Sequence, residues 1–362
     1  MPSAPRAGRR AYIDWARAIA VLLMIEAHVS DAWTRAGARS TIAFRDAVIL
    51  GGFAAPLFLW LAGLSLVLSA AATARRAGER AAGVRRVFRR GVEIFGLAFL
   101  FRLQAFVLSP GGSPWKLLRV DILNVMGPAI AVSGLVWAMS ESKAVTAALF
   151  AVAAAAIALV TPLVREITAI DRLPSLLQWY VRPSGAFTNF TMLPWSGFVF
   201  AGAVAGVLLS AVRDAHEERR ANAVIGFAGV LLVAAGFYLA SRPSLYRESS
   251  FWTSSPSWFV IRVGIMMLAL AVLYGLAEVA AALGLRIEPL EAFGRHSLFV
   301  YWIHVELVYG YASWLWRGRL PLWGAAVGYA AFVVLMYGAV RAEEQWLARR
   351  AAPRTPAQNA IM

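Results

Sequence analysis

Ten stretches of mostly apolar residues follow one another along the chain, and each is about as long as a bilayer is thick. A helix that crosses a membrane needs roughly 20 such residues. We predict spanning helices near residues 11–33, 47–73, 91–108, 123–140, 144–163, 191–211, 223–240, 256–282, 294–315 and 321–340. The predicted fold class is therefore an all-α integral membrane protein, a polytopic bundle of about ten transmembrane helices.

The composition agrees with this pattern and excludes other classes of protein. Of the 362 residues, 60% are hydrophobic and 15% are charged, whereas soluble domains average about 45–50% and about 25%. The net charge of +15 could suggest nucleic acid, but no hydrophilic basic domain is present to bind it. The chain has no cysteine, which excludes disulfides, thiol nucleophiles and cysteine-ligated metals. Its few histidines lack metal-binding spacing, so no metal is expected.

The distribution of the 35 lysines and arginines predicts how the chain is oriented. Most of them fall in segments that share one side of the membrane, and residues 75–90 are the densest of these. Since cytoplasmic loops are enriched in Lys and Arg, we expect both termini in the cytoplasm. We expect one transmembrane domain over residues 1–345 and a disordered cytoplasmic tail over 346–362. Three arginines lie inside predicted helices instead: Arg17, Arg102 and Arg262.

The first predicted helix carries five ionisable residues, Asp14, Arg17, Glu26, His28 and Asp31. At 100° per residue, all but Glu26 share one stripe, and His28 lies about 16 Å beyond Arg17 along the axis. An ionisable group inside a membrane costs about 2.5–3.5 kcal/mol, so we expect the stripe to face the bundle interior or a cavity. A purely structural role for the neighbouring Asp14 and Arg17 stays open.

Other polar and aromatic residues in apolar segments are candidates of second rank. For contact with the phosphates of a donor they are Arg102, Arg295 and Ser297, and for lining a cavity they are Trp195, Tyr301 and His304. Aromatic side chains are common near membrane interfaces in any case. His304 could equally be a structural hydrogen-bonding residue.

A histidine in a helical bundle, without a cysteine or serine nucleophile pattern around it, is suited to general-base catalysis. A cationic group some distance away on the cytoplasmic side is suited to an anionic donor such as coenzyme A. The pattern permits acyl transfer without establishing it. Two other interpretations stay open: a proton-coupled transporter or flippase that uses the buried charges of the first helix, and a scaffold without catalytic activity.

Four motifs occur in order along most of the chain: RAYIDWARAIAVLLMIEAH at 10–28, APLFLWLAGLSL at 55–66, LPWSGFVFAGAVAG at 193–206 and FGRHSLFVYWIH at 293–304. Together they resemble bacterial members of the heparan-α-glucosaminide N-acetyltransferase-like family. The spacing from Arg17 to His28 is also similar to that of acyltransferase family 3.

The resemblance implies a multi-pass enzyme of the bacterial cytoplasmic (inner) membrane, with no metal. It would move an acyl group, usually acetyl, from cytoplasmic acyl-CoA to a glycan or similar acceptor outside. His28 would be the catalytic base, with Asp14 and Arg17 as its motif companions. Besides the lipid bilayer, acyl-CoA and the acceptor, no partner is implied, and the oligomeric state, a homo-oligomer included, is left open.

The chain departs from the family pattern in one place and matches only one of two variants in another. Ala18 replaces the usual glycine after the motif arginine. In animal lysosomal members the position of His28 can be Asn, with the catalytic histidine further on in the following loop. The segment after His28 contains no second histidine here, so His28 is the candidate base in this region.

Overall fold

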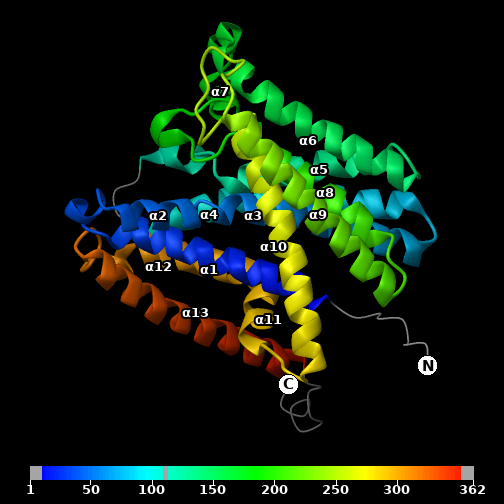
Figure 1. Cartoon of the computed structure of the whole chain (residues 1–362). Helices are drawn as coiled ribbons and strands as arrows, with labels where there is room; N and C mark the ends of the chain where they lie inside the picture. Colours follow the sequence, from blue (N-terminus) through cyan, green and yellow to red (C-terminus); the bar gives the residue numbers. More distant parts are fainter. Residues whose placement is uncertain (1–9, 109–112, 352–362) are drawn as a thin grey trace, which may run out of the picture.

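The computed structural model describes residues 10–108 and 113–351, and its regular structure within them is helical (Figure 1). The longer helices are α1 (Ala11–Trp33), α2 (Ile42–Gly51), α3 (Ala54–Ala77), α4 (Arg80–Leu108), α5 (Ile122–Ala138), α6 (Lys143–Glu166), α7 (Ser175–Val181), α8 (Met192–Ser210), α9 (Ala215–Ala240), α10 (Pro256–Ala282), α11 (Glu288–Arg295), α12 (Ser297–Tyr309) and α13 (Leu322–Ala351).

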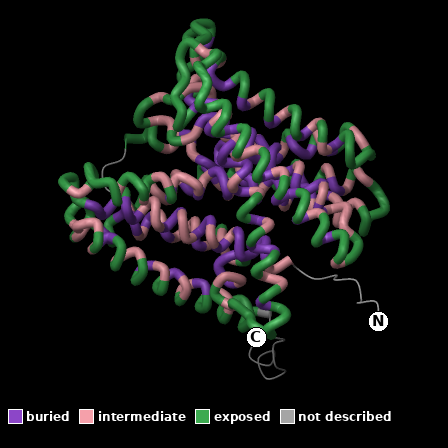
Figure 2. Tube along the Cα trace, viewed as in Figure 1, coloured by how far each residue is buried: buried purple, intermediate pink, exposed green. Residues whose placement is uncertain are grey.

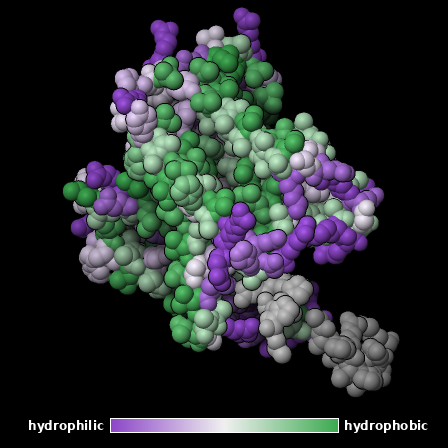
Figure 3. Space-filling model, turned by 45° about the vertical axis from the view of Figure 1, so that its right-hand side comes forward, coloured by the Kyte–Doolittle hydropathy of each residue, from purple (hydrophilic) through white to green (hydrophobic). Residues whose placement is uncertain are grey.

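The molecule is a polytopic membrane bundle, as the hydropathy pattern predicts. Among the described residues, seven helical segments are long and apolar enough to cross a membrane, and α5 and α12 are shorter apolar helices. Each of the ten predicted stretches coincides with one of these or with the charged helix α1. Burial is concentrated on the central helices (Figure 2). Exposed large apolar side chains lie on the outer helices α6, α9 and α13, and apolar surface covers much of the face in Figure 3.

The beginning of α1 and the last turns of α13 lie on the same side of the bundle. Gly294 of α11 packs so closely on the backbone of Asp14 that a Cβ atom there would clash with it. The neighbouring Arg295 makes an ion pair with Glu344 of α13, with 2.7 Å between nitrogen and oxygen. A chain that crosses the membrane an even number of times has both of its ends on the same side. We call the side where α1 begins the inner side, and the opposite side the outer side.

The C-terminal part of the chain differs from the expected boundary. α13 continues to Ala351, so the first six residues of the expected tail are helical. The rest of that tail, residues 352–362, lies outside the described residues, as does the N-terminal segment 1–9.

The centre of the bundle is the crossing of α3 and α8. A Cβ atom on Gly63 would overlap the backbone of Val199, and one on Gly202 would overlap the backbone of Trp60. Small residues at such crossings let two helix backbones touch, and this contact stabilises helix pairs in a membrane where apolar burial does not. The glycines of the second and third sequence motifs therefore fix the position of α3, which forms one wall of the cavity described below.

The break between α2 and α3 is at Gly52 and Phe53, just before Pro56. Proline favours a break at this point, because it has no N–H to bond to the carbonyl of the residue four positions earlier. That residue is Gly52, and the guanidinium of Arg262 donates to its carbonyl instead. The guanidinium also lies 4.4 Å from the ring of Phe53 and 4.6 Å from that of Trp258.

The ninth predicted stretch, 294–315, is divided between two helices. α11 ends at Arg295 and α12 runs from Ser297 to Tyr309. His296 between them has a non-helical backbone, and its Nδ1 atom lies 2.7 Å from a carboxylate oxygen of Glu343 on α13. This contact holds the junction against the last helix and lets α12 take its own direction into the bundle.

Candidate active site

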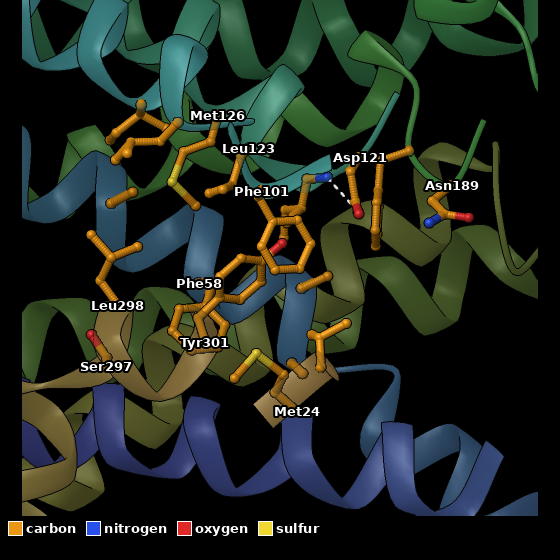
Figure 4. A pocket seen from close by; sticks show the side chains of 18 of the residues that line it. Met24, Phe58, Phe101, Asp121, Leu123, Met126, Asn189, Ser297, Leu298 and Tyr301 are labelled. Atoms are coloured by element: carbon orange, nitrogen blue, oxygen red, sulfur yellow. Dashed lines mark hydrogen bonds between the residues drawn. The ribbon is translucent and has the colours of Figure 1, made fainter. Parts of the chain in front are cut away.

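A cavity of about 1560 Å³ lies between α1, α3, α4, α5 and α12. Sites for drug-sized ligands are usually about 300–1,000 Å³, so this one can hold a larger molecule or two ligands together. In Figure 4 the rings of Phe58, Phe101 and Tyr301 converge near its middle, with Ser297 on one side and Asp121 on the other. These residues come from three different helices, α3, α4 and α12, and from the segment before α5.

The charged stripe of α1 faces this cavity, as its periodicity predicts. Arg17, His28 and Asp31 all line the cavity wall. Asp14 is only 3% exposed and accepts a hydrogen bond of 2.8 Å from Nη1 of Arg17, while Nη2 of Arg17 donates to the hydroxyl of Ser65 at 2.7 Å. The carboxylate of Asp14 and the hydroxyl of Ser65 together hold the Arg17 guanidinium at the cavity wall.

His28 makes a hydrogen bond with a second histidine from a distant part of the chain. Its Nδ1 atom lies 2.9 Å from Nε2 of His304 on α12. Nδ1 of His304 lies 2.8 Å from the backbone carbonyl of Val300. His304 is fully buried and is not part of the cavity wall, so it lies behind His28 as seen from the cavity. The sequence left its role open, and the structure places it in contact with the candidate base.

The inner end of the cavity is lined by cations. Its arginines on the first turns of α4 are Arg85, Arg86, Arg89 and Arg90. Their spacing puts them on one face of a helix, a signal that the sequence contains but that topology alone also explains. Arg86 donates to Ser69 on α3 at 2.9 Å, and Glu93 pairs with Arg89 and Arg90 at 2.8 and 3.3 Å. Glu79 pairs with Arg85, so two carboxylates face four guanidinium groups and this end remains positive.

Comparison with known families matches the sequence model described as heparan-alpha-glucosaminide N-acetyltransferase, catalytic, to residues 9–243. The match covers more than half of the chain. The chain belongs to this family. It is therefore a multi-pass membrane protein of an acetyltransferase family. No curated protein matches the chain.

In this acetyltransferase family member, the matched region holds only part of the candidate site. Asp14, Arg17 and His28 lie inside the matched range, whereas Ser297 and His304 lie beyond its end. The folded chain brings the two parts together at the cavity, because α12 packs beside α1. The C-terminal third of the chain thus completes a site that begins in the family's matched region.

The outer end of the cavity contains polar groups that sequence reasoning assigned elsewhere or missed. Arg102, expected near donor phosphates, makes an ion pair with Asp121, the residue that caps α5. Arg119 donates to Asn189 beside them. Since α4 begins at the inner side and Arg102 lies about 33 Å along it, this arginine is at the outer end. Arg102 therefore lines the end of the cavity opposite the arginines on the first turns of α4.

The remaining candidates divide between the cavity and the helix interfaces. Ser297, Tyr301 and Trp195 line the cavity. Arg295 is not among the lining residues, because its guanidinium pairs with Glu344 and with Glu291 at 2.7 and 3.7 Å. Its neighbour Ser297 is separated from it by the break at the start of α12. The sequence analysis named both as candidates for donor contact, and the structure places only Ser297 at the cavity.

One outer contact was not predicted from the sequence. The hydroxyl of Tyr309, at the end of α12, donates to a carboxylate oxygen of Asp31 at 2.8 Å. The ring of Tyr309 also meets the imidazole of His28 edge to face, with 5.5 Å between centroids. The two contacts hold the outer turns of α1 and α12 together around His28.

Proposed function

We propose that this protein transfers an acetyl group from cytoplasmic acetyl-CoA to a hydroxyl or amine of an acceptor on the outer side, such as a glycan. The observation that carries the proposal is one cavity with an arginine-rich inner end and His28 on its wall towards the outer end. Family membership supports acetyl as the group transferred. The bias of arginines to one side supports the inner side as the cytoplasmic one.

The residues at the inner end fit the charged part of coenzyme A. Guanidinium groups bind phosphate with several parallel hydrogen bonds, and four of them line this end on α4. From Arg17 to His28 the cavity wall extends about 16 Å along α1, a distance that suits the extended pantetheine arm. The hydroxyls of Ser69 and Ser297 also line the wall and can bond to polar groups of such an arm.

Acetyl-CoA supplies a thioester whose carbonyl carbon is open to attack. His28 accepts the proton of the acceptor O–H or N–H while the acceptor oxygen or nitrogen forms its bond to that carbon. The carbon–sulfur bond breaks, and the imidazolium of His28 returns the proton to the leaving thiolate. The side chain of His28 thus ends each cycle neutral, as it began. Arg17, fixed by Asp14 and Ser65, keeps a cation on the donor side of this reaction centre.

The test uses His28→Ala in proteoliposomes that contain radiolabelled acetyl-CoA, with glucosamine and lipid-linked amino sugars supplied as acceptors outside. We expect transfer to fall about 100-fold or more, since a positioned base contributes about 10²–10⁴-fold. His216→Ala, which changes an exposed histidine on α9, is the matched control and should keep full activity. Transfer by His28→Ala within a few-fold of wild type would remove His28 from the mechanism.

A binding measurement separates the enzyme from the transporter alternative. Acetyl-CoA and CoA should raise the melting temperature of the purified protein, because a ligand that binds only the folded state stabilises it. The His28→Ala variant should keep this shift. Flux that follows a pH gradient and needs no CoA, together with an unchanged melting temperature, would favour the transporter.

A further inference from the structure

The two ring nitrogens of His304 both have hydrogen-bond partners, and one partner decides where the proton is. A backbone carbonyl only accepts hydrogen bonds. Nδ1 of His304, 2.8 Å from the carbonyl of Val300, must therefore carry a hydrogen. In the neutral imidazole the other nitrogen, Nε2, then has a lone pair. The hydrogen-bond network thus assigns the tautomer of His304.

The tautomer of His304 determines that of His28. Nε2 of His304 can only accept, so Nδ1 of His28, 2.9 Å away, must donate to it. The two rings are within 5° of parallel, and their centroids are 5.1 Å apart. The centroid–centroid distance exceeds the nitrogen–nitrogen distance by about two ring radii. The two rings therefore meet edge to edge. The hydrogen bond therefore lies in both ring planes, where an imidazole lone pair points.

The reverse arrangement requires a charged His304. If its Nε2 carried a second proton, it would donate to His28 and leave the proton of His28 on Nε2. His304 is fully buried, and within residues 10–108 and 113–351 no carboxylate makes a salt bridge with it. A buried cation without such a partner is costly. The neutral form, with Nδ1–H on both histidines, is therefore the stable one.

We propose that His304 is a positioning residue that holds His28 in the Nδ1–H tautomer, so that Nε2 of His28 is the basic atom turned to the cavity. The inference rests on the proposed function, in which His28 is the base. A free histidine exchanges between two tautomers and several ring orientations, and only one of them presents a lone pair to the acceptor. The Val300 carbonyl and His304 remove the others, much as a carboxylate orients the histidine of a serine-protease triad.

Two features distinguish this pair from an ordinary packing contact. His28 and His304 are 276 residues apart, and His304 lies outside the range that the family model matches. His28 is on the cavity wall, whereas His304 is fully buried and does not line the cavity. A group so placed acts through His28 and has no contact of its own with a substrate in the cavity.

The functional test compares His304→Leu with His304→Gln. Leucine cannot accept the Nδ1–H of His28, whereas the amide oxygen of glutamine can. We expect kcat for acetyl transfer to fall about 10–100-fold in His304→Leu, while KM for acetyl-CoA changes less than twofold. In His304→Gln we expect most of the wild-type kcat to return. His216→Gln, the same change at an exposed site, is the control. A purely structural His304 predicts no such split between kcat and KM.

The spectroscopic test needs neither donor nor acceptor. Nitrogen-15 NMR of histidine-labelled protein distinguishes protonated from unprotonated ring nitrogens, and comparison with His28→Ala assigns the signals. We expect His28 protonated at Nδ1 in the wild type, a mixture of tautomers in His304→Leu, and the Nδ1–H form again in His304→Gln. A wild-type His28 protonated at Nε2, or full kcat in His304→Leu, would overturn the proposal.

The two experiments separate the proposal from the proposed function. If His28→Ala retains transfer, His28 is not the base, while the NMR signals still report its tautomer. If His28→Ala is inactive but His304→Leu is not, the base stands and the positioning role fails. Should His304→Leu not fold, the wild-type spectrum and His304→Gln still decide.

Discussion

The pairing of Arg262 with the Gly52 carbonyl leads to a prediction in which one substitution should correct another. Arg262 is 6% exposed and donates to the carbonyl that Pro56, lacking an N–H, leaves without its helical partner. Arg262→Met keeps a side chain of similar length but replaces the guanidinium, the hydrogen-bond donor, with an apolar end. Pro56→Ala restores a backbone N–H four residues after Gly52. The second change should therefore compensate for part of the first.

The structure sets the magnitude. A buried carbonyl left without a donor costs about 1–3 kcal/mol, and the loss of the contacts to the rings of Phe53 and Trp258 adds about 0.5–2 kcal/mol. We expect Arg262→Met to lower the free energy of unfolding by about 1.5–5 kcal/mol. Adding Pro56→Ala should recover up to about 1–3 kcal/mol of this, the part that belongs to the carbonyl.

The assay is an SDS-unfolding titration in mixed micelles, followed by far-UV circular dichroism, for the wild type, both single variants and the double variant. Proline to alanine has its own effect on helix propensity, so the interaction energy of the double-mutant cycle is the quantity to compare. A cycle in which the two effects add within about 0.5 kcal/mol would refute the idea that Arg262 replaces the missing N–H.

Two further predictions concern donor binding and helix packing. The double variant Arg86→Gln, Arg90→Gln should raise KM for acetyl-CoA about 10–30-fold, at about 1 kcal/mol per lost charge, and the effect should shrink at high salt. The control Arg220→Gln removes a charge on the same side but away from the cavity, and it should leave KM unchanged. Steady-state kinetics in which the double variant and the wild type have equal KM values would contradict the donor site. Gly63→Ala should destabilise the bundle by about 1–3 kcal/mol in the same SDS titration, because its methyl group would overlap the backbone of α8. In the control Gly96→Ala the added methyl group meets no atom within 4 Å, so this variant should be as stable as the wild type or more stable. Similar losses of stability in both variants would contradict the close crossing of α3 and α8.

The sequence by itself determined the class of protein, the helical segments and the polar face of α1. Hydropathy and helical periodicity are local properties, so ten apolar stretches and a stripe through Arg17, His28 and Asp31 can be read without the fold. The motifs also indicated the family. The density of arginines at 75–90 indicated which side of the membrane this segment occupies, although it did not say that several of these arginines line a cavity.

Only the tertiary structure decided which polar groups meet. The pairing of His28 with His304, the removal of Arg295 from the cavity and the position of Arg102 at its outer end all depend on how separate helices pack. In a membrane, apolar burial does not choose helix partners, because lipid is as apolar as the side chains. Close glycine crossings and a few buried hydrogen bonds make that choice, and their partners lie far apart in the sequence. The same cause explains Arg262, whose role became visible only when α10 was placed beside the carbonyl that Pro56 leaves open.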